Sequence, residues 1–266
     1  MSSVFNPTVA WITLRATLSR KRALLFLLPA VILIVVTLLL KLSRPPSRPR
    51  PSDVLGTFGF TVLLPLTALI IGTSVLGAEI DDGSIVHLLA TPVRRLSVIV
   101  TKYCVATVLT MLFAAVPELI AALISGGGDL PNKVIQHPGS PPMIIAGTPI
   151  DSSKFAIGLF VGALAGAVIY NALFVMVSVA TTRAIAVGLL YVLIWETLLS
   201  NFVSGARLLS ISHYSLGIAN GFANDPGLNA SLTVTTSVIM GAIVTVAALV
   251  LAVNLLSRFT LKGDPA

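Results

Sequence analysis

Charge, cysteine and histidine are all scarce in this chain of 266 residues. Only 10% of the residues are charged, whereas 56% are hydrophobic and the mean hydropathy is +0.99. A soluble domain with so little charge would expose very large apolar patches, so a soluble fold is excluded. The single cysteine, Cys104, rules out an intrachain disulfide. The histidines, His87, His137 and His213, lack the spacing of metal ligands, so no metal site is predicted.

Phosphate-binding motifs are absent as well. The chain has no Gly-x-x-x-x-Gly-Lys-(Ser/Thr) run and no soluble α/β unit to carry one, so we expect no ATP hydrolysis and no cofactor in this chain. Its net charge of +7 would suit nucleic acid, but the basic residues cluster at the ends of apolar runs. There they meet lipid headgroups and set the orientation of the chain. We therefore predict membrane lipid as a partner, and no nucleic acid.

Six apolar segments are long enough to cross a bilayer, which takes about 20 residues. They are 23–40, 54–78, 96–125, 155–180, 185–203 and 231–256. The predicted fold is an all-α membrane protein with six transmembrane helices in one domain over residues 1–266. No second domain is expected, because the polar parts are too small to form a core.

The distribution of basic residues sets the predicted orientation. An even number of spans puts both termini on one side, and we place that side in the cytosol. The cytosolic side then carries ten basic residues: Arg15, Arg20, Lys21, Arg22, Arg94, Arg95, Lys102, Arg183, Arg258 and Lys262. The outer side carries seven: Lys41, Arg44, Arg48, Arg50, Lys133, Lys154 and Arg207. This excess agrees with the positive-inside rule and predicts a multi-pass protein of the cytoplasmic membrane.

Three connecting regions have a distinct character. Before the first span, Phe5, Val9, Ile12 and Ala16 share one helical face, which predicts a helix along the membrane surface. The proline-rich and glycine-rich stretch 126–154 is expected to be an irregular outer loop. The semi-apolar stretch 204–230 is too broken to span, and we expect short helices set into the outer membrane face.

A charged break from Glu79 to Arg95 separates the second and third spans. Within it Ile85, Leu88 and Leu89 follow helical spacing, and Pro92 ends the segment. Asp81 and Asp82 can cap the start of a short helix, where negative charge also favours the helix dipole. The break is either a simple interfacial turn or a docking helix joined at both ends to a span.

The residues of this break resemble a motif of the membrane subunits of type-2 ATP-binding-cassette (ABC) exporters. In that family a glutamate after the second span opens the pattern Gly-(Ser/Thr)-hydrophobic-x-x-Leu-Leu-(Ala/Ser)-x-Pro-(Val/Ile)-x-Arg. The matching residues here are Glu79, Gly83, Ser84, Leu88, Leu89, Pro92 and Arg95. The surface helix, six spans and semi-apolar outer segment are also similar to the family. The chain departs from it in its basic, proline-rich connector 41–53, which is longer than the usual tight outer loop.

The resemblance implies a function and a set of partners. The family uses this element as a coupling helix gripped by a separate ATP-binding subunit, which carries the ATP and Mg²⁺. The residues expected to couple are Glu79, Asp81, Asp82, Gly83, Leu88, Leu89, Pro92 and Arg95. A second permease subunit, identical or different, would complete the transporter. With few charges in the spans, the expected cargo is lipophilic: a drug, an antibiotic or a lipid.

A few polar residues lie inside the spans. Glu196, near the midplane of the fifth span, costs about 2.5–3.5 kcal/mol to insert and must face protein or water. It either fixes packing through hydrogen bonds or lines a translocation path or dimer seam. Glu118 lies near the outer end of the third span, where it can reach the headgroups or serve the same path. Asn171 is expected to bond another helix or to join that path.

Glycines recur every four residues along the fourth span, at Gly158, Gly162 and Gly166. Such a strip lets another helix approach closely. The sequence leaves open whether that helix belongs to the same subunit or to a second one.

Two other functional classes remain as alternatives. A secondary transporter or channel would use Glu196 as its proton or ion site, but no broken spans or inverted repeat support it. An intramembrane enzyme would need a paired catalytic set, which the sequence does not expose.

Overall fold

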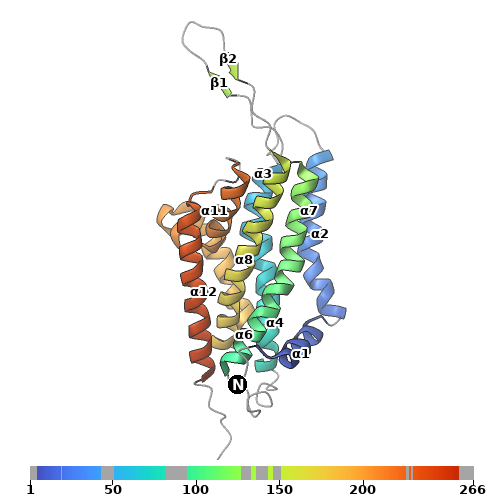
Figure 1. Ribbon diagram of the computed structural model, residues 1–266, viewed down its shortest axis with the longest axis vertical. Helices are drawn as coiled ribbons and strands as arrows, with labels where there is room; N and C mark the ends of the chain where they lie inside the picture. Colours follow the sequence, from blue (N-terminus) through green and yellow to red (C-terminus); the bar gives the residue numbers. More distant parts are fainter. Residues whose placement is uncertain are drawn as a thin grey trace, which may run out of the picture.

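A computed structural model of the chain describes residues 5–18, 20–42, 51–81, 95–126, 133–135, 143–145, 151–225, 228 and 230–257. In these residues the protein is an elongated bundle of helices (Figure 1). The first half contains α1 (Pro7–Thr17), α2 (Arg20–Leu42), α3 (Pro51–Val54), η1 (Leu55–Leu63), α4 (Leu64–Asp81), α6 (Arg95–Thr110), η2 (Met111–Ala115) and α7 (Val116–Ser125). The second half contains α8 (Ser152–Ala180), α9 (Ala184–Leu190), η3 (Tyr191–Leu199), α10 (Ser200–Phe202), η4 (Ser204–Leu209), α11 (Ile211–Ala223) and α12 (Val234–Ser257).

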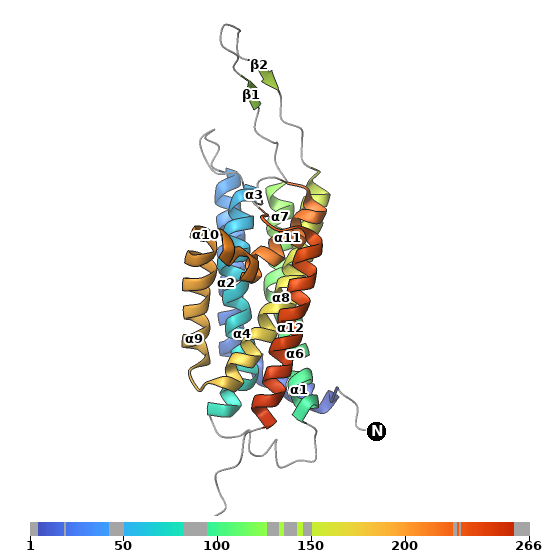
Figure 2. The same ribbon diagram turned by 90° about the vertical axis from the view of Figure 1, so that its left-hand side faces the viewer.

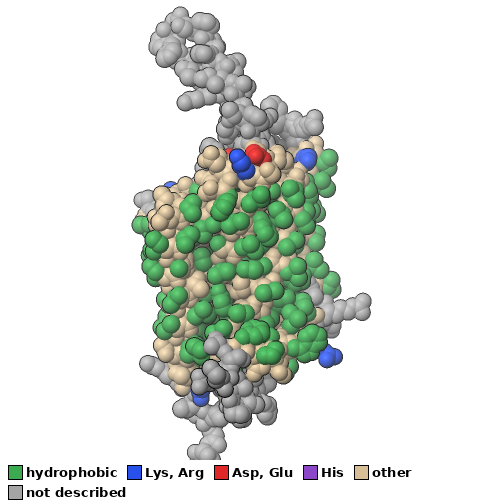
Figure 3. Space-filling model, viewed as in Figure 1, with side chains coloured by type: hydrophobic (Ala, Val, Ile, Leu, Met, Phe, Trp, Pro, Cys, Tyr) green, Lys and Arg blue, Asp and Glu red, His purple; other side chains and the backbone are tan. Residues whose placement is uncertain are grey.

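Five helical segments of the described chain are long and apolar enough to cross a membrane. They are Leu24–Leu42, Leu55–Gly77, Arg95–Ser125, Ser152–Ala180 and Val234–Ser257. The fifth predicted span, 185–203, is helical but shorter, since α9 has 7 residues and η3 has 9. Figure 3 shows hydrophobic side chains over the height of the bundle, with charged side chains gathered at its two ends. The chain is a multi-pass membrane protein.

Two of the spans contain π-helical turns just before a proline. The π-helix η1 ends at Leu63, two residues before Pro65, and η2 ends at Ala115, two residues before Pro117. A proline has no backbone N–H to donate, and its ring clashes with the carbonyl four residues earlier. A wider turn relieves that clash while neighbouring helices shield the backbone from lipid. The prolines thus leave both spans unbroken.

Helix α8 forms the centre of the bundle and contacts α4, α6, α7, α11 and α12. Asp151 caps its first turn by accepting hydrogen bonds from the Ser153 and Lys154 amides. The hydrogen bonds from Ser153 lower the pKa of Asp151. Midway along α8, Tyr170 and Phe174 are fully buried, with stacked rings 5.9 Å apart.

The glycine strip of α8 packs against α11 of the same chain. A methyl group on Gly158 would lie 2.6 Å from the carbonyl oxygen of Ala219. On Gly162 it would lie 2.6 Å from the Ala219 side chain, and on Gly166 2.7 Å from the Ser215 hydroxyl. The missing side chains let α11, which follows α10 and η4 in the chain, lie directly on α8. Figure 2 shows α11 in the upper part of the bundle, beside α8 and α12.

The predicted surface helix forms but buries a different face. Asn6 caps α1 through bonds from the Thr8 and Val9 amides. Val9, Thr13 and Thr17 are its buried residues, whereas Ile12 is 58% exposed. Ile12 and Ala16 are thus free to face lipid, and the predicted contact of this apolar face with the membrane surface stays a prediction. Threonines pack here because α1 lies against the polar start of α6, and the Asn6 amide donates to Thr101 Oγ1 at 3.1 Å.

The outer loop also differs from its prediction as wholly irregular. Strand β1 (Lys133–Ile135) pairs antiparallel with β2 (Met143–Ile145), with Lys133 opposite Ile145. Short runs rich in valine and isoleucine favour strands, and the Pro-Gly pair between them favours a turn. In stretch 204–230, the predicted short helices are present as η4 and α11.

We predict that Gly162→Ala destabilises the protein by about 1–3 kcal/mol, because the added methyl group overpacks the α8–α11 contact. Gly205→Ala is the control, since a methyl group at Gly205 meets nothing within 4 Å. The measurement is the fraction of detergent-solubilised protein that stays monodisperse after heating. Equal melting of the two variants would contradict this account of the strip.

Candidate functional site

The described ends of the charged break are helical: Glu79 lies in the last turn of α4, which ends at Asp81, and Arg95 begins α6. Five of the predicted coupling residues lie outside the described residues: Asp82, Gly83, Leu88, Leu89 and Pro92. The side chain of Asp81 lies outside them as well. The predicted coupling residues with described side chains are thus Glu79 and Arg95. They stand on the two helices that enter and leave the break.

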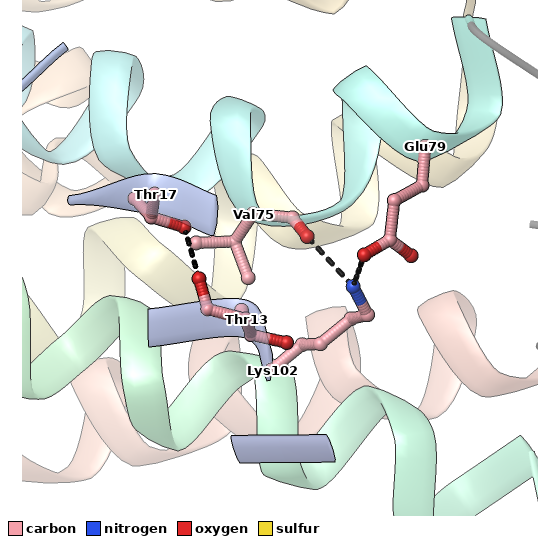
Figure 4. A network of polar contacts seen from close by, with 5 residues as sticks. All are labelled: Thr13, Thr17, Val75, Glu79 and Lys102. Carbon is pink, nitrogen blue, oxygen red and sulfur yellow. Dashed lines mark hydrogen bonds and ion pairs between the residues drawn. The ribbon is translucent and has the colours of Figure 1, made fainter. Parts of the chain in front are cut away.

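An ion pair joins these two helices. Lys102 Nζ lies 2.6 Å from Glu79 Oε1 and donates a second hydrogen bond to the Val75 carbonyl at 2.8 Å (Figure 4). The Lys102 side chain is only 1% exposed, whereas that of Glu79 is 28% exposed. Val75 and Glu79 are one helical turn apart on α4, so a single ammonium group holds the last turns of that helix.

Because the Lys102 side chain is buried, its pairing with Glu79 matters for the stability of the protein. An ammonium group away from water is costly unless it is paired and hydrogen-bonded. The carboxylate and the carbonyl together supply that compensation, and removal of one partner of such a pair typically costs about 3–5 kcal/mol. The end of α4 is therefore held to the second turn of α6.

Two other elements meet at the same end of the bundle. The Arg95 guanidinium donates to the carbonyl of Leu256, near the end of α12. A cation at a helix C-terminus also complements the helix dipole. Helix α1 joins through Thr101, and its Thr13 and Thr17 lie near Val75 in Figure 4. Helices α1, α4, α6 and α12 thus converge around the ends of the segment 82–94.

Sequence reasoning counted Lys102 only as a charge that sets topology. The signal that identifies its role is its place in α6, where the neighbouring Thr101 and Val105 are buried. A buried lysine needs a partner, and Glu79 is the acidic residue of the motif that precedes the break. Spacing alone did not show that the two helices place these residues face to face.

Glu196 forms a second polar network, where η3 meets the start of α11. It is fully buried in η3. Its carboxylate accepts five hydrogen bonds, from the Tyr191, Ser210 and Ser212 hydroxyls and from the Ile211 and Ser212 amides, at 2.5–3.3 Å. Those amides form the first turn of α11, where negative charge is stabilised. Glu196 therefore holds α11 to η3.

Glu118 does not reach the headgroups, contrary to that prediction. It is 4% exposed, and its carboxyl oxygens lie 2.7 Å from where a methyl group on Gly59 would stand. The lack of a side chain on Gly59 lets the carboxyl turn inward between α7 and η1. Its Oε1 has no hydrogen-bond partner within the described part of the chain.

Asn171 is fully buried, but its amide bonds its own helix instead of another one. Nδ2 donates to the Ala167 carbonyl at 2.7 Å. Its Oδ1 faces Gly72 of α4, which has no side chain to donate, and has no hydrogen-bond partner among the described residues. The predicted bond to another helix is therefore wrong. Glu196, Glu118 and Asn171 do not converge on one site, since they contact α11, η1 and α4 respectively.

We predict that Glu79→Ala destabilises the protein more than Lys102→Met does. The first change strands a buried ammonium group, at about 3–5 kcal/mol. The second leaves a carboxylate that water can reach, and methionine fills the space of the lysine stem. The double variant should recover part of the loss in a thermal double-mutant cycle. Strictly additive losses would show that the pair contributes no coupling.

The sequence model described as "ABC-2 family transporter protein" matches residues 17–136. The matched region begins in α1, includes α2, α4, α6 and α7, and contains both Glu79 and Lys102. No curated protein matches the chain at a significant level. Over residues 17–136 the chain is therefore similar to the ABC-2 transporter family, which agrees with a multi-pass membrane subunit of an ABC transporter.

Proposed function

We propose that the chain is the permease of an ATP-driven exporter and that residues 82–94 are its coupling element, gripped by a separate ATPase subunit. The observation that carries this proposal is the buried Lys102–Glu79 ion pair. It joins the two helices that flank the segment at the same end of the bundle, so a load on the segment is shared between them.

The proposed mechanism is mechanical. When the ATPase subunits close on ATP and Mg²⁺, they displace the segment 82–94. The ion pair makes the ends of α4 and α6 move as one body, and the Arg95 bond to Leu256 carries the displacement to α12. Because α8 contacts all three helices, the whole bundle tilts instead of one helix bending.

The proposed cargo is lipophilic. Both glutamates within the helical core, Glu118 and Glu196, are buried within the subunit. The exposed side chains along the described spans are mostly large and apolar. A path along such surfaces favours a drug, antibiotic or lipid over an ion. A second permease subunit, a copy of this chain or a relative, would supply the opposite wall.

We also propose that α9, η3 and α10 form the sixth crossing. They run without interruption from Ala184 to Phe202, a stretch of 19 residues that would span roughly 28 Å at the α-helical rise of about 1.5 Å per residue and spans somewhat less because η3 is π-helical. The short outer helices complete the span, because Glu196 anchors α11 beside η3. Both termini then lie on one side, which we assign to the cytosol of the cytoplasmic membrane.

The alternative, a secondary transporter with a proton or ion site at Glu196, has less support. Five protein donors already occupy the carboxylate, which offers about four lone-pair positions. An ion would have to displace bonds that hold α11 in place. Glu196→Gln, which brings an amide donor against those donors, is therefore expected to lower stability without creating or abolishing dependence on a proton gradient.

We predict that an ATPase co-purifies with the chain and hydrolyses Mg-ATP, and that Leu88→Asp abolishes both the association and the hydrolysis. A charge on the apolar face of the segment would desolvate in the contact with the ATPase. Leu208→Asp is the matched control, because Leu208 is 47% exposed in η4, at the other end of the bundle. Transport that persists without a nucleotide-hydrolysing subunit would refute the proposal.

A further inference from the structure

A groove of about 670 Å³ opens between α2, α4 and the start of α9. It lies at the end of the bundle that also holds the Glu79–Lys102 pair, since Gly77 of α4 and the turn between α8 and α9 both line it. Helix α9 contacts α4 and α8 and stands at the edge of the bundle in Figure 2. The groove is separate from the ion pair, which joins α4 to α6.

The walls of the groove are apolar and open to the surroundings. Leu25 on α2 is 50% exposed, and on α9 Ile185 is 63% and Leu189 39% exposed. The floor is α4, where Thr73 and Ser74 donate their hydroxyl hydrogens to carbonyls of their own helix. Those hydroxyls present only acceptor capacity to the groove, so a ligand is anchored elsewhere.

Among the described residues that line the groove, Arg183 places a cation at its polar mouth. Arg183 is exposed in the turn between α8 and α9, and the exposed Thr182 stands next to it. The Arg183 backbone amide donates to Thr181 Oγ1 at 3.2 Å, which fixes the turn. Among the described residues its guanidinium forms no hydrogen bond or ion pair. A guanidinium presents a planar set of donors that binds phosphate at two points.

We infer that the groove holds a resident anionic phospholipid, with its phosphate on Arg183 and the upper part of its acyl chains along Leu25, Ile185 and Leu189. The position of Arg183 also suits a lipid phosphate. Arg183 follows the end of α8, which is long and apolar enough to cross a membrane, and basic residues at span ends typically meet headgroups. The apolar walls of the groove continue from Arg183 along the bundle. From Arg183 to Leu189 the wall is roughly 9 Å long at about 1.5 Å per residue, which suits the headgroup-proximal part of a lipid.

This lipid has a structural consequence. It fills the space between α2 and α9 and ties the α8–α9 turn to the membrane surface. It is bound without nucleotide and without cargo, so the inference does not depend on the direction of transport or on its substrate.

The test measures phospholipids retained by the purified protein, by native mass spectrometry after extraction from vesicles of phosphatidylcholine and phosphatidylglycerol. The wild type should retain phosphatidylglycerol with about a tenfold preference, the scale of one charge-assisted contact. Arg183→Gln should abolish that preference. Arg15→Gln, which removes an exposed arginine of α1 that does not line the groove, should preserve it.

Ala186→Phe provides a second test that leaves the charge in place. Ala186 lines the groove and is exposed, so the larger ring occupies lipid space and should lower retention of both lipids. Each variant is first checked for a monodisperse elution profile. The inference is overturned if the wild type shows no preference, if Arg15→Gln lowers it as much as Arg183→Gln, or if Ala186→Phe retains lipid normally. A wild type without lipid preference is also the result expected if a second copy of the chain covers the groove.

Discussion

A charged or polar group inside this apolar bundle is stabilised only by partners within the protein, because lipid offers none. Lys102 meets that constraint through Glu79 and the Val75 carbonyl, and Glu196 meets it through five donors. In both cases partners from a different helical element take part, namely Val75 and Glu79 of α4 for Lys102 and Ile211 and Ser212 of α11 for Glu196, so satisfying one side chain fixes the relation between two elements. These two networks specify helix arrangements that apolar packing alone leaves less specific, whereas side chains such as Thr73 and Asn171 bond only their own helix.

The two networks stabilise different parts of the bundle. At the end of α4 and α6, the ion pair makes one rigid junction around the segment 82–94. At the other, Glu196 and the glycine strip hold α11 against η3 and α8. Between them lie the aromatic core around Tyr170 and the two π-helical turns that precede prolines. A bundle whose helices are held together at both ends would move as one body if a partner subunit displaced the segment 82–94, as proposed above.

The phospholipid proposed for the groove at Arg183 would make the membrane part of the support of α9. Helix α9 is the start of the shortest apolar segment, and its contacts are with α4 and α8. A lipid between α2 and α9 would supply the support that protein does not provide there. The same arginine that orients the turn would then also bind the headgroup, which links topology to lipid recognition.

The sequence alone determined the membrane class, the positions of the long spans, the charged break and the family resemblance, since these depend on the local order of apolar and charged residues. It could not determine which side chains face each other. Nothing in the spacing of Lys102 and Glu79 showed that they pair, and Glu118 lies inward only because Gly59 of another element leaves room. The glycine strip predicted a close neighbour but did not name α11. Helix rotation and helix pairing arise from packing between distant segments, and only the tertiary structure decided them.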